Sequence, residues 1–314
     1  MKTKMINLAL ILVGLLLSCS KKDKLVEKIE TVKEPTETLQ EHWPNHDLLV
    51  TKVYQDEHVV FYYDDKMDKS IKWPFKTMSD TWAYVKKTYG AFGLDPKLYV
   101  VFHKSEVTNP GTPFEDCLTC GGHPAGYKDP SHDYRNFIDC GLAGQDDWKE
   151  ATGQAIGIPV HEVGHIVCGD SHEVNGSPSD VLWKDSKFME IFNYDVYKNI
   201  GRKDEADKVY AEMQTKVDTF PRANSYWFRD WFYPIYSKYG EGKLLNGYFA
   251  LLAKEFPKKN GAYTRNLNWG EFLHFWSGAA GTDLKEQFTI AFGWTSEWEA
   301  MLKNAKTDFP NVKY

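Results

Sequence analysis

The chain has 314 residues, a formal net charge of −6 at pH 7 and an isoelectric point near 5.9. Because 42% of its residues are hydrophobic and 26% are charged, it can bury a sizeable core and is not a disordered chain. It has no basic surplus to displace the counterions of a polyanion and no DNA- or RNA-binding motif, which argues against a nucleic-acid partner.

The N-terminus has the pattern of an export signal. Lys2 and Lys4 precede an apolar run over residues 6–17, which suits a signal-peptide core and is too short to span a bilayer comfortably. The run ends in Leu17-Ser18-Cys19, which resembles the bacterial lipobox, in which a lipid is attached to the cysteine. We therefore expect a signal peptide over 1–18 and a membrane anchor at Cys19. The alternative is an ordinary signal peptide with an incidental cysteine.

Residues 19–44 are expected to form a flexible tether, since the segment is rich in Lys, Glu and Thr and has little to bury. Ser20, directly after the cysteine, favours the outer membrane of a bacterial cell envelope, because an Asp there would resemble an inner-membrane retention signal. The folded domain is expected to span residues 45–314.

Strands and one long helix are predicted over the first part of this domain. Residues 58–63 and 98–103 are apolar runs typical of buried strands, and 136–139 is a third candidate. Between the first two, Phe75, Met78, Trp82, Val85 and Tyr89 recur at helical spacing, which predicts a helix over 74–91. Residues 105–135 are rich in Gly, Pro and Asp and are expected to form a long loop.

Helices are predicted for the rest of the chain. One covers 146–168, with interruptions at Gly153, Gly157 and Pro159, and a loop follows over 170–181. Further helices are expected over 181–200, 203–218, 224–239, 241–256, 269–276, 282–291 and 295–305. The tryptophans of this tail, such as Trp227 and Trp276, are expected to pack in a core rather than to form a sugar-binding face. Glu271 and Asp283 are not expected to act as a glycosidase pair, because nothing in the sequence indicates that they lie close together.

Four cysteines remain besides Cys19, namely Cys117, Cys120, Cys140 and Cys168. In an exported protein this even number favours two disulfides, with three possible pairings. Free buried thiols and a structural metal at Cys117-x-x-Cys120 remain the alternatives.

The sequence His161-Glu162-Val163-Gly164-His165 carries the clearest chemistry. Histidines four residues apart on a helix lie on one face, so both imidazoles can bind one zinc ion. Glu162 is placed to act as the general base toward a water that the metal activates. The alternative without a metal is a buried structural helix whose histidines are satisfied by hydrogen bonds.

This motif resembles that of the gluzincin clan of zinc metallopeptidases, and its HExGH form is most similar to the basic-secretory-protein-like group. The resemblance implies an α+β, zincin-like catalytic domain. It would have an upper α/β lobe over 45–169, with a small mixed or antiparallel sheet and the zinc helix, and a mostly helical lower lobe over 170–314. It also implies Glu190, on a following helix, as the third zinc ligand.

Other groups of zinc peptidases suggest different third ligands. In metzincins a third His follows in HExxHxxGxxH, and His172 stands one residue late for that pattern. Glu173 lies close behind, and Asp180 or Asp185 would serve by analogy with aspzincins. Asp195 is the candidate for orienting a ligand histidine. The oxyanion donor is expected among the following residues: Tyr194, Tyr226, Arg229, Tyr233 and His274. His103, His123 and His132 are expected to be structural or exposed.

The expected function is zinc-dependent hydrolysis of peptide bonds in extracytoplasmic proteins or glycoproteins. The alternative is a noncatalytic surface lipoprotein that binds peptide or glycan on a zincin scaffold.

Overall fold

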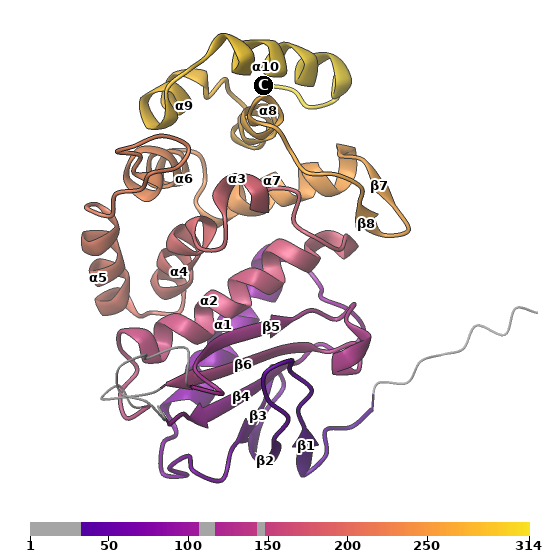
Figure 1. The fold of residues 1–314 in the computed structure, drawn as a ribbon, viewed down its shortest axis with the longest axis vertical. Coiled ribbons are helices and arrows are strands. Elements are labelled where there is room, and N and C mark those ends of the chain that lie inside the picture. The colour runs from indigo at the N-terminus through magenta and orange to yellow at the C-terminus, as the bar shows by residue number, and fades with distance from the viewer. Residues whose placement is uncertain (1–32, 107–116, 143–147) are drawn as a thin grey trace, which may run out of the picture. The chain divides into compact units, whose positions relative to one another are not determined.

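The structure is a computed structural model that describes residues 33–106, 117–142 and 148–314 (Figure 1). The predicted signal peptide, Cys19 and the first part of the tether lie outside the described residues. Residues from Glu34 onward form one compact unit. Within the described ranges, no helix is both long and apolar enough to cross a membrane.

A six-stranded mixed sheet forms the first half of this unit, in the order β1-β2-β3-β4-β6-β5. β3, β4 and β6 are parallel, whereas β1, β2 and β5 add antiparallel pairs on the two sides. The strands are β1 (Thr38–Gln40), β2 (Leu49–Gln55), β3 (Val59–Tyr63), β4 (Leu98–Lys104), β5 (Gly121–Ala125) and β6 (Asn136–Leu142). The central three are buried along almost their whole length because both faces of the sheet are covered; β3 and most of β4 are apolar, whereas β6 also carries Asn136 and Asp139.

Helices α1 (Trp73–Tyr89) and α2 (Gln154–Asp170) cover one face of the sheet (Figure 1). α1 has Pro74 in its first turn, where the fixed φ of proline is suitable, and is followed by the C-cap Gly90, whose φ is 92°. Alternate residues of the central strands, such as Phe61, Val100 and Ile138, contribute to the main hydrophobic core on this face.

The second half is helical, apart from a short hairpin. Its helices are α3 (Asp180–Trp183), α4 (Lys187–Asn199), α5 (Lys203–Met213), α6 (Tyr233–Lys238), α7 (Gly242–Glu255), α8 (Trp269–Ala280), α9 (Lys285–Phe292) and α10 (Ser296–Asp308), and the hairpin joins β7 (Lys258–Lys259) to β8 (Ala262–Tyr263). Trp227, Trp231 and Trp276 are fully buried, as expected of packing residues. Glu271 closes a capping box at the start of α8 and pairs with Arg265.

Residues 41–48, here called the strap, cover the other face of the sheet. The strap follows β1 and returns to β2, and its Trp43 stacks on His123 of β5. A second, smaller hydrophobic core lies beneath it, built from the remaining strand residues such as Val60 and Val101. The boundary expected between residues 44 and 45 is therefore wrong, since β1 is part of the sheet and Glu41 is 1% exposed.

Several predicted elements differ in detail from the structure. The loop expected over 105–135 contains β5, and the helix expected from 146 starts at Gln154. The helix expected over 181–200 is broken at Lys184, whose φ is 56°. Of two possible disulfides one is present, Cys117–Cys120, whereas Cys140 and Cys168 are separate buried thiols in the main core.

Candidate metal centre

Helix α2 carries the predicted motif and is packed on several sides. It contacts β5 and β6 of the sheet, α1 beside it and α4 of the helical half. Gly164 permits the close contact with α4, because a Cβ there would lie 2.6 Å from the Met189 sulfur. The helix face that bears the two histidines is thus fixed by its neighbours.

His161 and His165 point their Nε2 atoms at each other, 3.1 Å apart. Burial, with smaller contributions from His165 and Lys216, lowers the pKa of His161 to about 4. Burial also lowers the pKa of His165. Both imidazoles are therefore neutral at pH 7, the form in which a ring nitrogen offers its lone pair to a metal ion.

Asp185 completes a group of three possible ligands with the two histidines. Its Oδ1 lies 3.3 Å from His165 Nε2, and one donor atom from each of the three residues lies within 4.8 Å of the other two. Asp185 stands in the break between α3 and α4, directly after Lys184. It was one of the aspartates considered from sequence, and the break that places it was not predicted.

Glu190 does not lie in this group. Its Oε1 accepts ion pairs from Lys216 at 3.0 Å and Lys187 at 3.5 Å, and Lys187 is paired in turn with Asp218. Glu190 is buried, and the partners of its carboxylate are lysines. The structure therefore brings Asp185, rather than Glu190, to the paired histidines.

The other expected third ligands are held elsewhere. His172 bonds through Nε2 to Asn246 of α7 at 2.7 Å. Glu173 is exposed, and Asp180 accepts a hydrogen bond from the Trp183 indole at the start of α3. None of these three joins His161 and His165 in the group of possible ligands.

Glu162 lies on α2 directly beneath the edge strand β5. A Cβ at Gly122 would lie too close to Glu162 Oε1, so any larger residue there would require the carboxylate to shift. Burial raises the pKa of Glu162 to about 8, and the charges of Asp185 and Asp139 add to the rise. A dication held by the neighbouring histidines would lower this pKa again.

The predicted supporting residues belong to other contacts. Asp195 accepts hydrogen bonds from Tyr84 at 2.6 Å and Tyr236 at 2.7 Å, so the expectation that it orients a ligand histidine is not met. Tyr194 and Tyr233 pack in an aromatic cluster, and His274 bonds to Tyr314 and to the Phe309 carbonyl. Arg229 pairs with Asp230 and stacks on Tyr226.

A second group of possible metal ligands lies beneath the strap and was missed from sequence. Glu41, His46, His103 and Asp139 are all buried and can hold a metal ion. The signal was weak, because the four residues are scattered over the strap, β4 and β6. His103 was expected to be structural or exposed, and it is fully buried.

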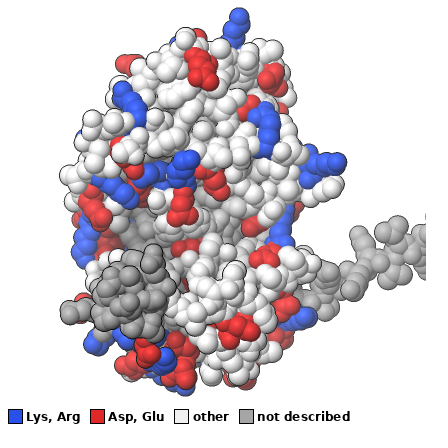
Figure 2. Space-filling model, in the orientation of Figure 1, with Lys and Arg blue, Asp and Glu red and all other residues white. Residues whose placement is uncertain are grey.

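Acidic and basic side chains are intermixed on the face of the molecule shown in Figure 2, so neither charge dominates there. Comparisons with models of protein families, with curated proteins and with solved structures gave no match.

Proposed function

We propose that the protein is a zinc metallopeptidase that hydrolyses peptide bonds in extracytoplasmic proteins or glycoproteins. The observation that carries this proposal is the convergence of His161 Nε2, His165 Nε2 and Asp185 Oδ1, with Glu162 beside them. Two nitrogens and one oxygen leave a fourth position for substrate or water, which is the usual arrangement of a catalytic zinc site.

The donor set fits zinc on its own chemistry. Two neutral imidazoles facing each other at 3.1 Å can share one hydrogen bond, or both can direct their Nε2 lone pairs, together with Asp185, at a bound cation. Bound zinc supplies Lewis acidity, which polarises a peptide carbonyl and makes a water molecule more acidic.

Glu162 is the general base in this proposal. Its carboxylate is buried beside the first histidine, where it takes a proton from the attacking water and passes it to the leaving amine. The dication that this proposal places beside Glu162 would lower its raised pKa, so that the carboxylate is ionised and able to accept the proton.

β5 is proposed to align the substrate. It is an edge strand that pairs with β6 on one side and lies against α2 at Gly122. An extended peptide added to its other side would run directly past Glu162, using the backbone pairing by which sheet edges capture peptides. The zincin likeness rests on this combination of a mixed sheet, an antiparallel edge strand and the motif helix below it.

The first test is the variant Glu162→Gln. It is expected to lower kcat for cleavage of a protein or peptide substrate by about 10²–10⁴-fold, because the base is lost, while leaving zinc at the histidines. The matched control is Glu173→Gln, which removes an exposed carboxylate just after the end of α2. Hydrolysis that survives both Glu162→Gln and chelation would contradict the proposal.

The cell-envelope location remains a separate proposal that rests on Cys19. Metabolic labelling with a radioactive fatty acid should modify the parent and leave Cys19→Ala unlabelled. Labelling of both, or of neither, would remove the lipid anchor from the proposal.

A further inference from the structure

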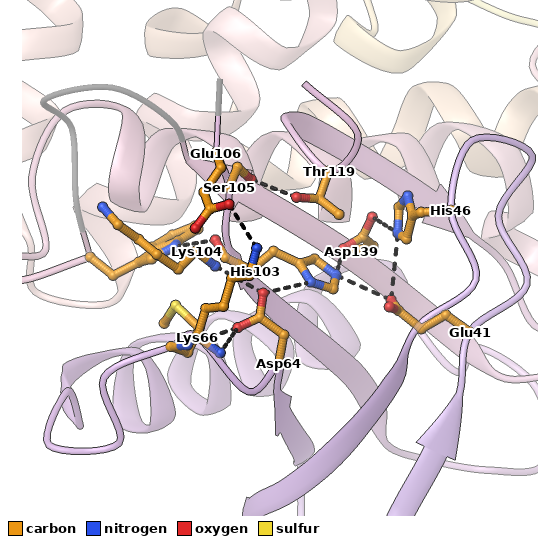
Figure 3. Close-up of polar contacts among 12 residues, drawn as sticks. Glu41, His46, Asp64, Lys66, His103, Lys104, Ser105, Glu106, Thr119 and Asp139 are labelled. Atoms are coloured by element: carbon orange, nitrogen blue, oxygen red, sulfur yellow. Dashed lines mark hydrogen bonds and ion pairs between the residues drawn. The ribbon is translucent and has the colours of Figure 1, made fainter. Parts of the chain in front are cut away.

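The buried group under the strap has the arrangement of a closed metal site (Figure 3). His103 Nε2 lies 2.7 Å from Asp139 Oδ1 and 3.3 Å from Glu41 Oε1, and His46 Nε2 lies 3.1 Å from Asp139 Oδ2 and 3.8 Å from Glu41 Oε1. Ligand atoms about 2.0–2.1 Å from a tetrahedral zinc ion are separated by about 3.3 Å. The four separations, 2.7 to 3.8 Å, bracket that value, with Asp139 facing the two histidines through different oxygens, and one donor atom from each of the four residues lies within 4.8 Å of the other three.

Several of these atoms lack well-directed hydrogen bonds. Among the described residues, Glu41 Oε2, His46 Nε2 and Asp139 Oδ1 are buried without a hydrogen-bond partner of acceptable geometry, although opposite charges are close. Buried polar atoms are nearly always paired, so three orphans in one cluster need an explanation. A bound cation would give these atoms a common partner, because it accepts their lone pairs.

The outer nitrogens of both rings are held, as those of metal-bound histidines usually are. His103 Nδ1 lies 3.2 Å from Asp64 Oδ2, and His46 Nδ1 lies 3.2 Å from Asn45 Oδ1. These contacts leave Nε2 of each ring directed at Glu41 and Asp139, as Figure 3 shows. Asp139 is also bonded by His123 Nδ1 of β5 at 3.0 Å.

We propose that Glu41, His46, His103 and Asp139 bind a divalent transition metal, zinc by the donor set, as a structural site distinct from the paired histidines of α2. The side chains of the four residues are at most 1% exposed, so no ligand position is open to substrate. Two imidazoles and two carboxylates suit zinc better than calcium or magnesium, which take oxygen ligands. The metal fastens the strap to β4 and β6.

Charge balance supports a cation here. Glu41, Asp139 and Asp64 place three carboxylates around the two imidazoles, and a dication offsets two of these buried charges. The competing arrangement holds two extra protons, one on each imidazole. A metal measurement separates the two arrangements, because only the first contains a metal ion.

The test uses the full chain with His161→Ala and His165→Ala combined, so that the site on α2 is removed. After loading with zinc chloride and gel filtration, we expect about one zinc per chain by elemental analysis. Chelation should lower the Tm of this double variant by roughly 5–10 °C, since the metal binds only the folded state. Cobalt substitution should give the visible absorption of a four-coordinate site with nitrogen and oxygen ligands.

Two further variants in the same background assign the metal to this cluster. Asp64→Asn keeps the four ligands but weakens the support of His103, and it is expected to lower zinc affinity about 10–100-fold. The matched control, His42→Asn, changes an exposed histidine next to Glu41 and should retain the metal. A folded double variant that binds no zinc or cobalt, or a zinc affinity unchanged by Asp64→Asn, would overturn the proposal. The proposed peptidase activity would be untouched by either result.

Discussion

At the scale of single residues, the choice between Asp185 and Glu190 decides how the catalytic metal would be held. Glu190 is already neutralised by Lys187 and Lys216, so using it as a ligand would break both ion pairs, although Lys187 would keep Asp218. Asp185 is not held by a lysine in this way: its side chain is 82% exposed, and its described ion pair is with His165. The proposed ligand set is therefore His161, His165 and Asp185.

Asp185→Ala and Glu190→Ala should separate these two carboxylates. Because a first-sphere ligand is lost, we expect Asp185→Ala to raise the zinc concentration needed for half-maximal hydrolysis by more than about 100-fold. Glu190→Ala should lower the stability of the protein and leave the zinc concentration for half-maximal hydrolysis nearly unchanged. Measuring hydrolysis as a function of the free zinc concentration reports zinc binding at the catalytic site alone. The opposite ranking would restore Glu190 as the third ligand.

Gly122→Ala tests the contact between β5 and Glu162. The new methyl group must displace the Glu162 carboxylate, and a displacement of about 1 Å can cost on the order of 10²-fold in rate. We expect kcat to fall with little loss of zinc. Gly169→Ala on α2 is the control, since nothing lies within 4 Å of its added Cβ. Full activity in Gly122→Ala would mean that Glu162 need not sit beneath this strand.

At the scale of elements, the break between α3 and α4 could not be read from the apolar pattern. Residues 181–200 have a helical spacing of apolar side chains, which predicts one helix. Lys184 instead adopts φ 56° and ψ −166°, a region that is essentially reserved for glycine. β5 was missed for a related reason, because Gly121-Gly122-His123-Pro124-Ala125 has the composition of a turn and is held as a strand by its pairing with β6.

Lys184→Gly should relieve strain at the break. We expect it to raise the free energy of unfolding by about 1 kcal/mol, since glycine adopts this conformation without a Cβ penalty. Lys184→Ala is the control, because it removes the same side chain, including its contact with the Phe220 ring, and keeps the strain. Denaturant unfolding of the three proteins measures the difference. Equal stability of the glycine and alanine variants would show that the backbone is not strained there.

At the scale of the whole folded unit, Asp195 links the sheet half to the helical half. It lies on α4 and accepts hydrogen bonds from Tyr84 of α1 and Tyr236 of α6. Burial raises its pKa to about 6, against the hydrogen bonds from the two tyrosines, which lower it. Ionisation of this carboxyl is therefore unfavourable in the folded state.

The raised pKa predicts a pH dependence of stability. Asp195 loses its proton near pH 4 when unfolded and near pH 6 when folded, so its contribution to stability is full below pH 4 and falls as the pH rises to 6. Between pH 4 and 7 the parent should lose about 3 kcal/mol relative to Asp195→Asn. Urea unfolding of both proteins at several pH values tests this. A difference that is constant with pH would contradict the raised pKa.

Much of the architecture could be predicted from local patterns. The central strands and α1 follow from apolar runs and helical spacing, and the motif helix follows from His161 and His165. The strap could not, because Glu41 lies in a segment whose composition predicts a tether and His46 stands just after that segment. Its place in the fold depends on contacts with His103 and Asp139, which are distant in sequence.

The strap also determines how the protein would bear tension. The chain enters the folded unit at β1, the edge strand at the opposite end of the strand order from β5. A pull on the residues before Glu34 is resisted first by the hydrogen bonds of residues 35–37 to Lys52 and Tyr62, next by the three residue pairs of β1 with β2, and then by Glu41 and His46. A metal at that point would act as a mechanical clamp. With this metal bound, β1 could separate from β2 under an applied force while the strands near Glu162 keep their register.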